Sequence, residues 1–325
     1  MAANVNDIRN AVYKLPTDVK EMVRLGIQHS IWSLMIGGLF PVGVSDQVDQ
    51  LLNDAQGRQG TVLDVGCGSA IWATNMAKTF SRAWVVGLDL NAQEFSDAPE
   101  NFEFIQGDLD QTLPKFNGRA SIVHCRCVAQ HVRDPQTLVL LLSQTLRPGG
   151  LLLLADGDWT VYDQHKKLVE PFKWWNYGIT NLNPAEPIVL EKDACGRSWY
   201  ASWLDFFGNL TRSKGYRPIE ELVKNVDALT VLDSHRYLSP INWPGEGIEN
   251  GEDLGRILNI NQRDFFVGSK EIAVQAGFSH EMIEVWGQHY EAEIDSGHFY
   301  NMWHYLTAQK RETLINLKVG NLDYM

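Results

Sequence analysis

The sequence predicts an α/β fold in which a doubly wound, mostly parallel sheet of seven strands is packed between helices. Two observations predict it. From Thr61 onwards, short apolar runs rich in β-branched residues alternate with helical stretches, which is the pattern of parallel βαβ units. The first of these runs leads directly into a Gly-x-Gly turn and then a helix, the arrangement found at the ligand-binding edge of open α/β sheets.

Each expected strand is a short apolar run bounded by turn residues. The seven runs are 61–65, 83–88, 102–106, 121–125, 151–155, 229–238 and 298–306. Helices are expected between them, including 70–79 and 135–146, and the second of these helices stops at the Pro148-Gly149-Gly150 segment. The alternation weakens after Asp156, so the regular part of the sheet is expected before that residue.

The flanking segments differ from this core in pattern. Residues 1–58 contain no strand pattern and read as helices, with Thr17 as a candidate N-cap, so we expect a helical lid outside the sheet. Residues 59–158 form the core. Residues 159–227 are rich in aromatic side chains and are expected to form a helical cap insertion, and residues 228–325 to complete the sheet and the substrate pocket. No linker divides these parts, which favours one elaborated domain.

Composition excludes several classes of function. The formal net charge is -12 and no Lys/Arg cluster occurs, so nucleic acid is not expected as a partner. No run of 18 apolar residues and no signal-peptide core is present, so we expect a cytoplasmic protein with no membrane partner. The Cys125-x-Cys127 pair beside His124 lacks the second ligand pair of a zinc site, so no metal is expected. Composition leaves the oligomeric state open, a homodimer included.

Small and acidic residues at three consecutive strand ends point to a bound nucleoside. Gly66 and Gly68 follow the first strand and let a ligand approach the backbone closely. Asp89 ends the second strand, where a carboxylate can accept both ribose hydroxyls, and Asp108 ends the third, where a carboxylate can accept an adenine amino group. The turn also fits a nicotinamide dinucleotide, but Ile71 stands at the position of the third glycine of that fingerprint.

Five segments of the core resemble the class I S-adenosylmethionine-dependent methyltransferases, which have a Rossmann-like sheet. The segments are Leu63-Asp64-Val65-Gly66-Cys67-Gly68, Gly87-Leu88-Asp89, Gln106-Gly107-Asp108, His131-Val132-Arg133-Asp134-Pro135 and Leu146-Arg147-Pro148-Gly149-Gly150. The resemblance implies S-adenosyl-L-methionine as the cofactor and S-adenosyl-L-homocysteine as its product. It places the methionine part at the glycine turn, the ribose at Asp89, the adenine at Asp108 and Leu109, and the methionine amino group at the backbone near Cys125. The cofactor-binding residues that it implies are Tyr13, Asp64, Gly66, Cys67, Gly68, Asp89, Leu90, Asp108, Leu109 and Cys125.

The flanks resemble a narrower group, the fungal LaeA-like small-molecule methyltransferases of secondary metabolism. The matching N-terminal residues are Tyr13-x-Leu15-Pro16-x-Asp18, Glu21, Arg24 and Gln28-His29. The matching C-terminal residues are Pro240-x-x-Trp243-Pro244, Gly277-Phe278-Ser279 and His298-Phe299-Tyr300. Ser69 and Ala70 depart from the threonine and glycine usual in that group, and Ala129-Gln130-His131 looks more like bacterial quinone- and small-molecule-type enzymes.

Methyl transfer needs a nucleophile held in line with the sulfonium methyl and, for a phenol, a base. His131 follows the fourth strand and His29 lies in the expected lid; each is a candidate base or, alternatively, a packed structural residue. Asp156 follows the fifth strand and is a candidate to orient a histidine, or else a turn acid. Arg126 is a candidate for a substrate carboxylate or an ion pair, and His124 is expected to face the sheet packing.

The aromatic residues of the expected cap suggest the class of acceptor. Flat apolar surfaces with polar edges suit a small, largely apolar or aromatic metabolite. The candidate substrate residues are Trp159, Trp174, Trp175, Trp199 and Trp203. Trp199 and Trp203 are also spaced as core residues of one helix face. The sequence therefore predicts methyl transfer to a small acceptor, at oxygen in preference to nitrogen or carbon. A cofactor-dependent rearrangement, and a regulatory cofactor-binding protein acting through a partner, are the alternatives.

Overall fold

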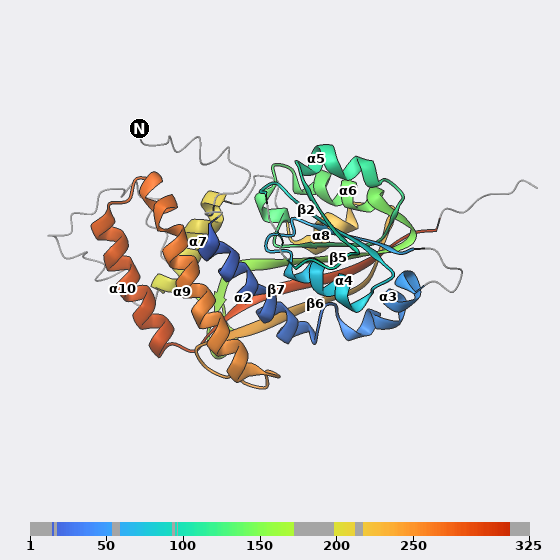
Figure 1. The fold of residues 1–325 in the computed structure, drawn as a ribbon. Helices are drawn as coiled ribbons and strands as arrows, with labels where there is room; N and C mark the ends of the chain where they lie inside the picture. Colours follow the sequence, from blue (N-terminus) through green and yellow to red (C-terminus); the bar gives the residue numbers. More distant parts are fainter. Residues whose placement is uncertain are drawn as a thin grey trace, which may run out of the picture.

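Seven strands form one sheet in the part of the chain that the computed structural model describes, which comprises residues 15, 18–53, 59–92, 95, 97–171, 198–211 and 217–312. The strands are β1 (Thr61–Val65), β2 (Trp84–Asp89), β3 (Phe102–Gln106), β4 (Ala120–Arg126), β5 (Leu146–Tyr162), β6 (Leu229–Ile241) and β7 (Phe299–Lys310). They lie in the order β3-β2-β1-β4-β5-β7-β6 (Figure 1). The predicted doubly wound, mostly parallel sheet is confirmed.

The direction in which strands are added reverses between β1 and β4. β2 and β3 are added in parallel on one side of β1, and β4 and β5 are added in parallel on the other side. β7 then pairs antiparallel with both β5 and β6. A crevice opens at the carboxyl ends of the strands where such a reversal occurs, and open α/β sheets bind their ligands there.

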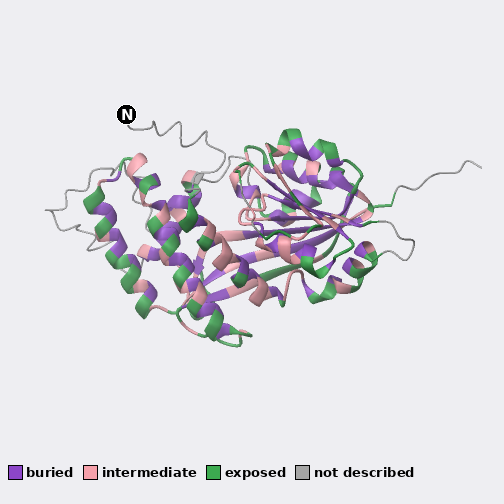
Figure 2. Ribbon diagram, in the orientation of Figure 1, coloured by how far each residue is buried: buried purple, intermediate pink, exposed green. Residues whose placement is uncertain are grey.

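Helices cover both faces of the sheet. They are α2 (Val19–Ile36), α3 (Ser45–Leu52), α4 (Ile71–Thr79), α5 (Leu109–Thr112), α6 (Pro135–Thr145), α7 (Trp199–Thr211), α8 (Ile219–Lys224), α9 (Gly251–Gln275) and α10 (His280–Ser296), with short 3-10 turns η1 (Val42–Val44), η2 (Leu113–Phe116) and η3 (Ala129–His131). One buried cluster joins α2, α3 and α4 with α7, α9 and α10, and a second includes α6 and α8. Figure 2 shows largely buried strands, with exposed residues concentrated on the outer sides of the helices. None of the helices in the described ranges is long and apolar enough to cross a membrane.

β5 is much longer than the sequence pattern predicts. The apolar run covers residues 151–155, but the strand extends from Leu146 to Tyr162 because β7 pairs with it as far as the Tyr162↔Tyr300 register. Trp159 therefore lies on a strand, and the expectation of a helical cap that begins at residue 159 is wrong. Within residues 159–227 the structure describes the helices α7 and α8; α7 packs against β5 and α10, and α8 packs against β6 (Figure 1).

α2 belongs to the main core and is not an appendage outside it. Its first turn is capped by Asp18, whose carboxylate accepts from the backbone N–H of Glu21 at 2.9 Å. Thr17, the N-cap expected from the sequence, lies outside the described residues. Trp32 of α2 is fully buried, and its ring meets that of Trp303 on β7 edge-on at 5.2 Å. The local sequence does not reveal this contact. No strand precedes α2, so the position of the helix relative to the sheet cannot be inferred from a βα unit.

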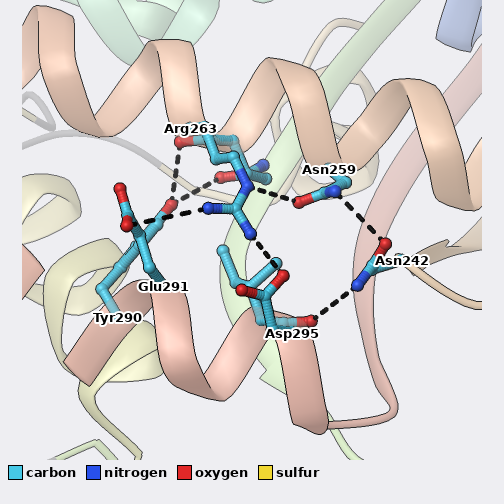
Figure 3. Close-up of polar contacts among 8 residues, drawn as sticks. Asn242, Asn259, Arg263, Tyr290, Glu291 and Asp295 are labelled. Atoms are coloured by element: carbon cyan, nitrogen blue, oxygen red, sulfur yellow. Dashed lines mark hydrogen bonds and ion pairs between the residues drawn. The ribbon is translucent and has the colours of Figure 1, made fainter. Parts of the chain in front are cut away.

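A polar network fixes α10 against α9. Arg263 of α9 forms an ion pair with Asp295 of α10 at 2.6 Å and a longer one with Glu291 at 3.9 Å (Figure 3). Its Nε donates to Asn259 Oδ1 at 2.9 Å, and Asn259 Nδ2 donates to Asn242 Oδ1 at 3.2 Å, just after β6. The two long helices and the end of β6 are therefore held in one arrangement.

Candidate active site

Two adjoining cavities lie at the carboxyl-terminal edge of the sheet. The first has a volume of about 230 Å³ and is lined by the turn after β1, the ends of β2 and β4, and the segment after β3. The second, of about 80 Å³, lies between α2, α9, β7 and the end of β5. Leu25, Gln28, Cys127 and His131 line both cavities, so the two share a boundary.

The glycines of the turn after β1 are required by its conformation. Gly66 and Gly68 have φ angles of 69° and 52°, a region that residues with a side chain rarely adopt. A side chain on Gly66 would also collide with Val128. The backbone N–H groups of Gly66 and Cys67 both donate to the carbonyl of Leu88, at 2.8 and 3.0 Å, and so tie the turn to β2. The turn therefore leaves backbone accessible at the wall of the first cavity.

Two carboxylates line the same cavity from neighbouring strand ends. Asp89 accepts from the backbone N–H of Gly68 at 2.9 Å and of Asn91 at 3.0 Å, one on each oxygen. Each oxygen retains a lone pair for a further donor, such as a hydroxyl. Asp108 caps α5 by accepting from the backbone N–H of Asp110 at 2.9 Å. Other predicted residues in this wall are Cys67, Leu90 and Leu109.

A buried Asp–His pair forms the floor of the first cavity. Nδ1 of His124 lies 2.7 Å from Oδ1 of Asp64, and the imidazole stacks on the indole of Trp72 with ring centroids 3.8 Å apart. Burial lowers the pKa of His124 from its ordinary value, and this effect exceeds the opposing attraction of Asp64. The imidazole is therefore neutral, with Nδ1–H donating to Asp64. Oδ2 of Asp64 and Nε2 of His124 make no hydrogen bond with the described residues.

His124 is buried and packs against Trp72, as expected from the sequence, and it also lines the first cavity, which the sequence did not indicate. The signal that could have found it is the register of parallel strands: Asp64 and His124 are partners across β1 and β4, so their side chains emerge on the same face.

Arg126, two residues further along β4, is a cation in the wall of the same cavity. Its Nη2 lies 3.2 Å from Nδ1 of His29, and within the described residues it forms no ion pair with a carboxylate. Burial, followed by the charge of Arg126, lowers the pKa of His29 to about 4. His29 is therefore a neutral acceptor for the guanidinium, which leaves the other N–H groups of Arg126 for a ligand.

His29 lines neither cavity, although it is a candidate base from the sequence. The residues of α2 that do line them are Met22, Arg24, Leu25 and Gln28, of which Met22, Leu25 and Gln28 are spaced three apart on one helix face. His29 follows Gln28 and is turned to another side of the helix, where it is 8% exposed. The neighbouring Gln28 is therefore the lining residue.

Of the other two candidate catalytic residues, His131 lies at the cavities and Asp156 does not. His131 ends the short η3 turn and lines both cavities. Asp156 is 1% exposed and lines neither of them. Its Oδ1 accepts from Nε2 of Gln130 at 2.8 Å, and Gln130 lines the second cavity. Asp156 thus positions the amide of Gln130.

The candidate substrate tryptophans are also separated by the fold. Trp159 lines the second cavity. Trp203 is fully buried, and its Nε1 donates to Ser269 of α9 at 3.0 Å. Trp199 stacks on His289 of α10 with ring centroids 4.5 Å apart. Trp199 and Trp203 therefore pack helix against helix, as their spacing on one face allows, and line neither cavity. Tyr13, Trp174 and Trp175 lie outside the described residues.

The side chain of Cys125 is fully buried and lines neither cavity, whereas the role that the resemblance implies for this residue belongs to its backbone. Successive residues of a strand point to opposite faces, so the neighbours of Cys125 line the first cavity instead. These neighbours are His124 and Arg126.

The first cavity fits a ligand that joins an amino acid to a nucleoside. An ammonium group would meet Oδ2 of Asp64 and Nε2 of His124, and a carboxylate would meet Arg126. A ribose diol would meet Asp89, and an adenine amino group Asp108. These are the groups of S-adenosylmethionine. Among the described residues, no group of three or more His, Cys, Asp or Glu side chains is placed to hold a metal ion.

Comparison with known proteins agrees with this geometry. Residues 41–186 match a family model described as a methyltransferase domain. The secondary metabolism regulator laeA of Coprinopsis cinerea is 27% identical over 228 residues, which make up 70% of this chain and 49% of that protein. The secondary metabolism regulator laeA of Aspergillus flavus is 33% identical over 43% of this chain and 36% of its own length. Methyltransferase str3 of Strobilurus tenacellus is 31% identical over 44% of this chain and 48% of its own length. The chain thus matches half or less of the length of each of these curated relatives.

Proposed function

Because this chain contains a class I S-adenosylmethionine-dependent methyltransferase domain, we propose that it transfers the cofactor's methyl group to a hydroxyl oxygen of a small metabolite. The observation that carries this proposal is the shared boundary of the two cavities, formed by Leu25, Gln28, Cys127 and His131. A cofactor in the first cavity and an acceptor in the second would be neighbours, as direct transfer requires.

The polar groups of the first cavity bind different parts of the cofactor. Asp64 and His124 accept the ammonium group, Arg126 binds the carboxylate and Asp89 accepts the ribose hydroxyls. When bound, S-adenosylmethionine supplies a methyl group on a positively charged sulfur, which needs no further activation. The chain's own part in the reaction is to hold both molecules in line, to exclude water and to accept a proton.

The proton comes from the acceptor hydroxyl. Its oxygen bonds to the methyl carbon as the carbon–sulfur bond breaks, the electron pair of that bond stays on sulfur to give S-adenosylhomocysteine, and the hydroxyl proton must leave. We assign His131 as the base that takes this proton, because it lines both cavities. We assign His29 a positioning role toward Arg126, since its pKa of about 4 makes it a weak base.

A regulatory role is the second candidate function. Two of the three relatives named above are called regulators of secondary metabolism, and the third is called a methyltransferase. We infer that this chain also acts in secondary metabolism. A regulator would bind the cofactor and act through a partner with little turnover.

Incubation with methyl-labelled S-adenosylmethionine and metabolite extracts of the source organism tests the proposal. Mass spectrometry of the products should show a small molecule that has gained one labelled methyl group at a former hydroxyl. Label on nitrogen or carbon would overturn the assignment to oxygen. Tight binding of S-adenosylhomocysteine without any labelled product would favour the regulator.

A further inference from the structure

The second cavity is surrounded by buried polar atoms that no described residue satisfies. Nε1 of Trp159, Nε1 of Trp303, Nδ2 of Asn301 and Oε1 of Gln130 make no hydrogen bond with the described part of the chain. All four residues line this cavity. Asn301, Gln130 and Trp303 are 2%, 5% and 6% exposed. Buried donors and acceptors are normally paired, so four such atoms around one cavity indicate a polar ligand.

Neighbouring side chains fix the orientation of Asn301. Its Oδ1 accepts from the hydroxyl of Tyr200 at 2.7 Å and from Nε2 of Gln262 at 3.1 Å. Tyr290, seen in Figure 3, in turn donates to the carbonyl of Gln262 at 3.0 Å. Because Oδ1 already has two donors, Nδ2 is the atom left for a ligand. Residues of α7, α9 and α10 thus hold this donor in place.

Asp156 orients Gln130 in a similar way. Nε2 of Gln130 donates to Oδ1 of Asp156 at 2.8 Å. An ionised carboxylate has no hydrogen to donate, so the amide end of Gln130 that faces Asp156 must be its N–H group. The amide oxygen Oε1 is therefore the end of Gln130 left for a donor. The residues that line the cavity accordingly carry three N–H donors and one oxygen acceptor that have no partner among the described residues.

The charge and size of the cavity narrow the class of ligand. The guanidinium of Arg24 is neutralised by Glu21 through two bonds of 2.8 and 2.7 Å, and Asp158 adds a carboxylate to the lining. An anion would be repelled by Asp158, and an ammonium group would face three N–H donors. The volume of about 80 Å³ favours a ligand group of only a few heavy atoms.

We propose that the second cavity is the methyl-acceptor site and binds a small, uncharged hydroxy-carbonyl group. The carbonyl oxygen accepts from the donors of Asn301, Trp159 and Trp303. The hydroxyl donates to Oε1 of Gln130 when the acceptor binds, and passes its proton to His131, which lines the same cavity, during methyl transfer. The assignment of this ligand as the acceptor rests on the proposed methyl transfer. It replaces the flat, largely apolar acceptor expected from the number of aromatic residues.

Ligand-observed NMR titration with three small probes tests the proposal on protein saturated with S-adenosylhomocysteine. Hydroxyacetone carries a carbonyl and a hydroxyl, butan-2-one carries a methyl in place of the hydroxyl, and benzene has neither group. We expect hydroxyacetone to bind roughly 3–10-fold more tightly than butan-2-one, the effect of one hydrogen bond between neutral groups. Benzene should bind more weakly than both.

Single substitutions test separately the N–H donors that bind the carbonyl and the oxygen that accepts from the hydroxyl. Trp303→Phe and Trp159→Phe each remove one N–H and keep an aromatic ring, so each should weaken the binding of both ketones roughly 3–10-fold. Gln130→Met should weaken only hydroxyacetone. Trp84→Phe, whose ring packs against Phe116 in the other buried cluster, is the matched control and should change neither affinity.

Three results would overturn the proposal: tighter binding of benzene than of hydroxyacetone, no binding of any probe, or unchanged ketone affinity in both Trp159→Phe and Trp303→Phe. Binding of S-adenosylhomocysteine alone is measured in parallel. A protein that binds hydroxyacetone in this pattern but not S-adenosylhomocysteine would overturn the proposed methyl transfer while leaving the polar cavity assignment supported.

Discussion

Nδ1 of His124 donates to Oδ1 of Asp64 at 2.7 Å across the β1–β4 register, and this bond fixes the side chains at the floor of the first cavity. Since burial lowers the pKa of His124, the imidazole stays neutral and its Nε2 is an acceptor. The cation Arg126 lines the same cavity. Acceptors and a cation on one wall complement the two charges of an amino acid.

Substitution of either charged group should therefore affect only ligands that carry the amino-acid part. Asp64→Asn and Arg126→Met should each weaken binding of S-adenosylhomocysteine by about 1.5–3 kcal/mol, the worth of hydrogen bonds to charged groups. Binding of 5′-methylthioadenosine, which lacks the amino-acid part, should stay near wild type. Isothermal titration calorimetry measures both ligands, with Asp46→Asn on the exposed side of α3 as the control. Equal losses for the two ligands would contradict these roles.

Asp89 should behave differently from these residues. Asp89→Ala removes the acceptor of the ribose hydroxyls, so S-adenosylhomocysteine and 5′-methylthioadenosine should both bind about 1–3 kcal/mol more weakly. Because Asp89 also accepts from the backbone N–H groups of Gly68 and Asn91, circular dichroism must show that the fold is retained. Unchanged affinity for both nucleosides would remove Asp89 from the site.

Loss of His131 should slow the reaction without loosening the cofactor. We expect His131→Gln to lower kcat roughly 100–10,000-fold on an alcoholic acceptor, while the affinity for S-adenosylhomocysteine stays near wild type. His165→Gln, at an exposed position, is the matched control. A folded His131→Gln protein with full activity on such an acceptor would exclude His131 as the base.

His29 should make the folded protein sensitive to mild acid. Its pKa falls from the ordinary 6.5 to about 4 on folding, so the unfolded chain binds the extra proton between these values. The free energy of unfolding is therefore at its full value above pH 6.5 and decreases as the pH falls toward 4. The total decrease due to His29 is up to about 3 kcal/mol. Urea denaturation between pH 7.5 and 4 should show a smaller loss in His29→Gln, which keeps an acceptor for Arg126. Identical pH slopes would contradict the assignment.

Substitution by glycine should cost less stability at Ala70 than at the nearby Ala73. Ala70 caps α4 with φ 53° and ψ 17°, a left-handed conformation that costs an alanine roughly 1–2 kcal/mol. In Ala70→Gly, release of this strain offsets the lost methyl, so the free energy of unfolding should change by about 0.5 kcal/mol or less. Ala73→Gly, equally buried inside α4, should cost about 2 kcal/mol. Chemical denaturation of the two variants measures the difference, and equal losses would show that Ala70 is not strained.

The sequence by itself determined the sheet and the strand-end residues that line the first cavity. Gly66, Gly68, Asp89 and Asp108 lie at consecutive strand ends, and carboxyl ends of parallel strands meet at one edge whatever covers the sheet. Strand positions follow from local apolar runs, so the core pattern and the polar residues that end it can be read in order along the chain.

Only the tertiary structure decided the second cavity. Gln130, Trp159, Gln262 and Asn301 meet there because β7 pairs with the extended β5 and α9 packs across α2, and neither contact is encoded by a local period. The same long-range packing separated residues that looked alike in sequence, such as Trp159 in the cavity and Trp203 between helices. Periodicity shows which side of an element is buried, but which partner buries it depends on contacts between segments far apart in the chain.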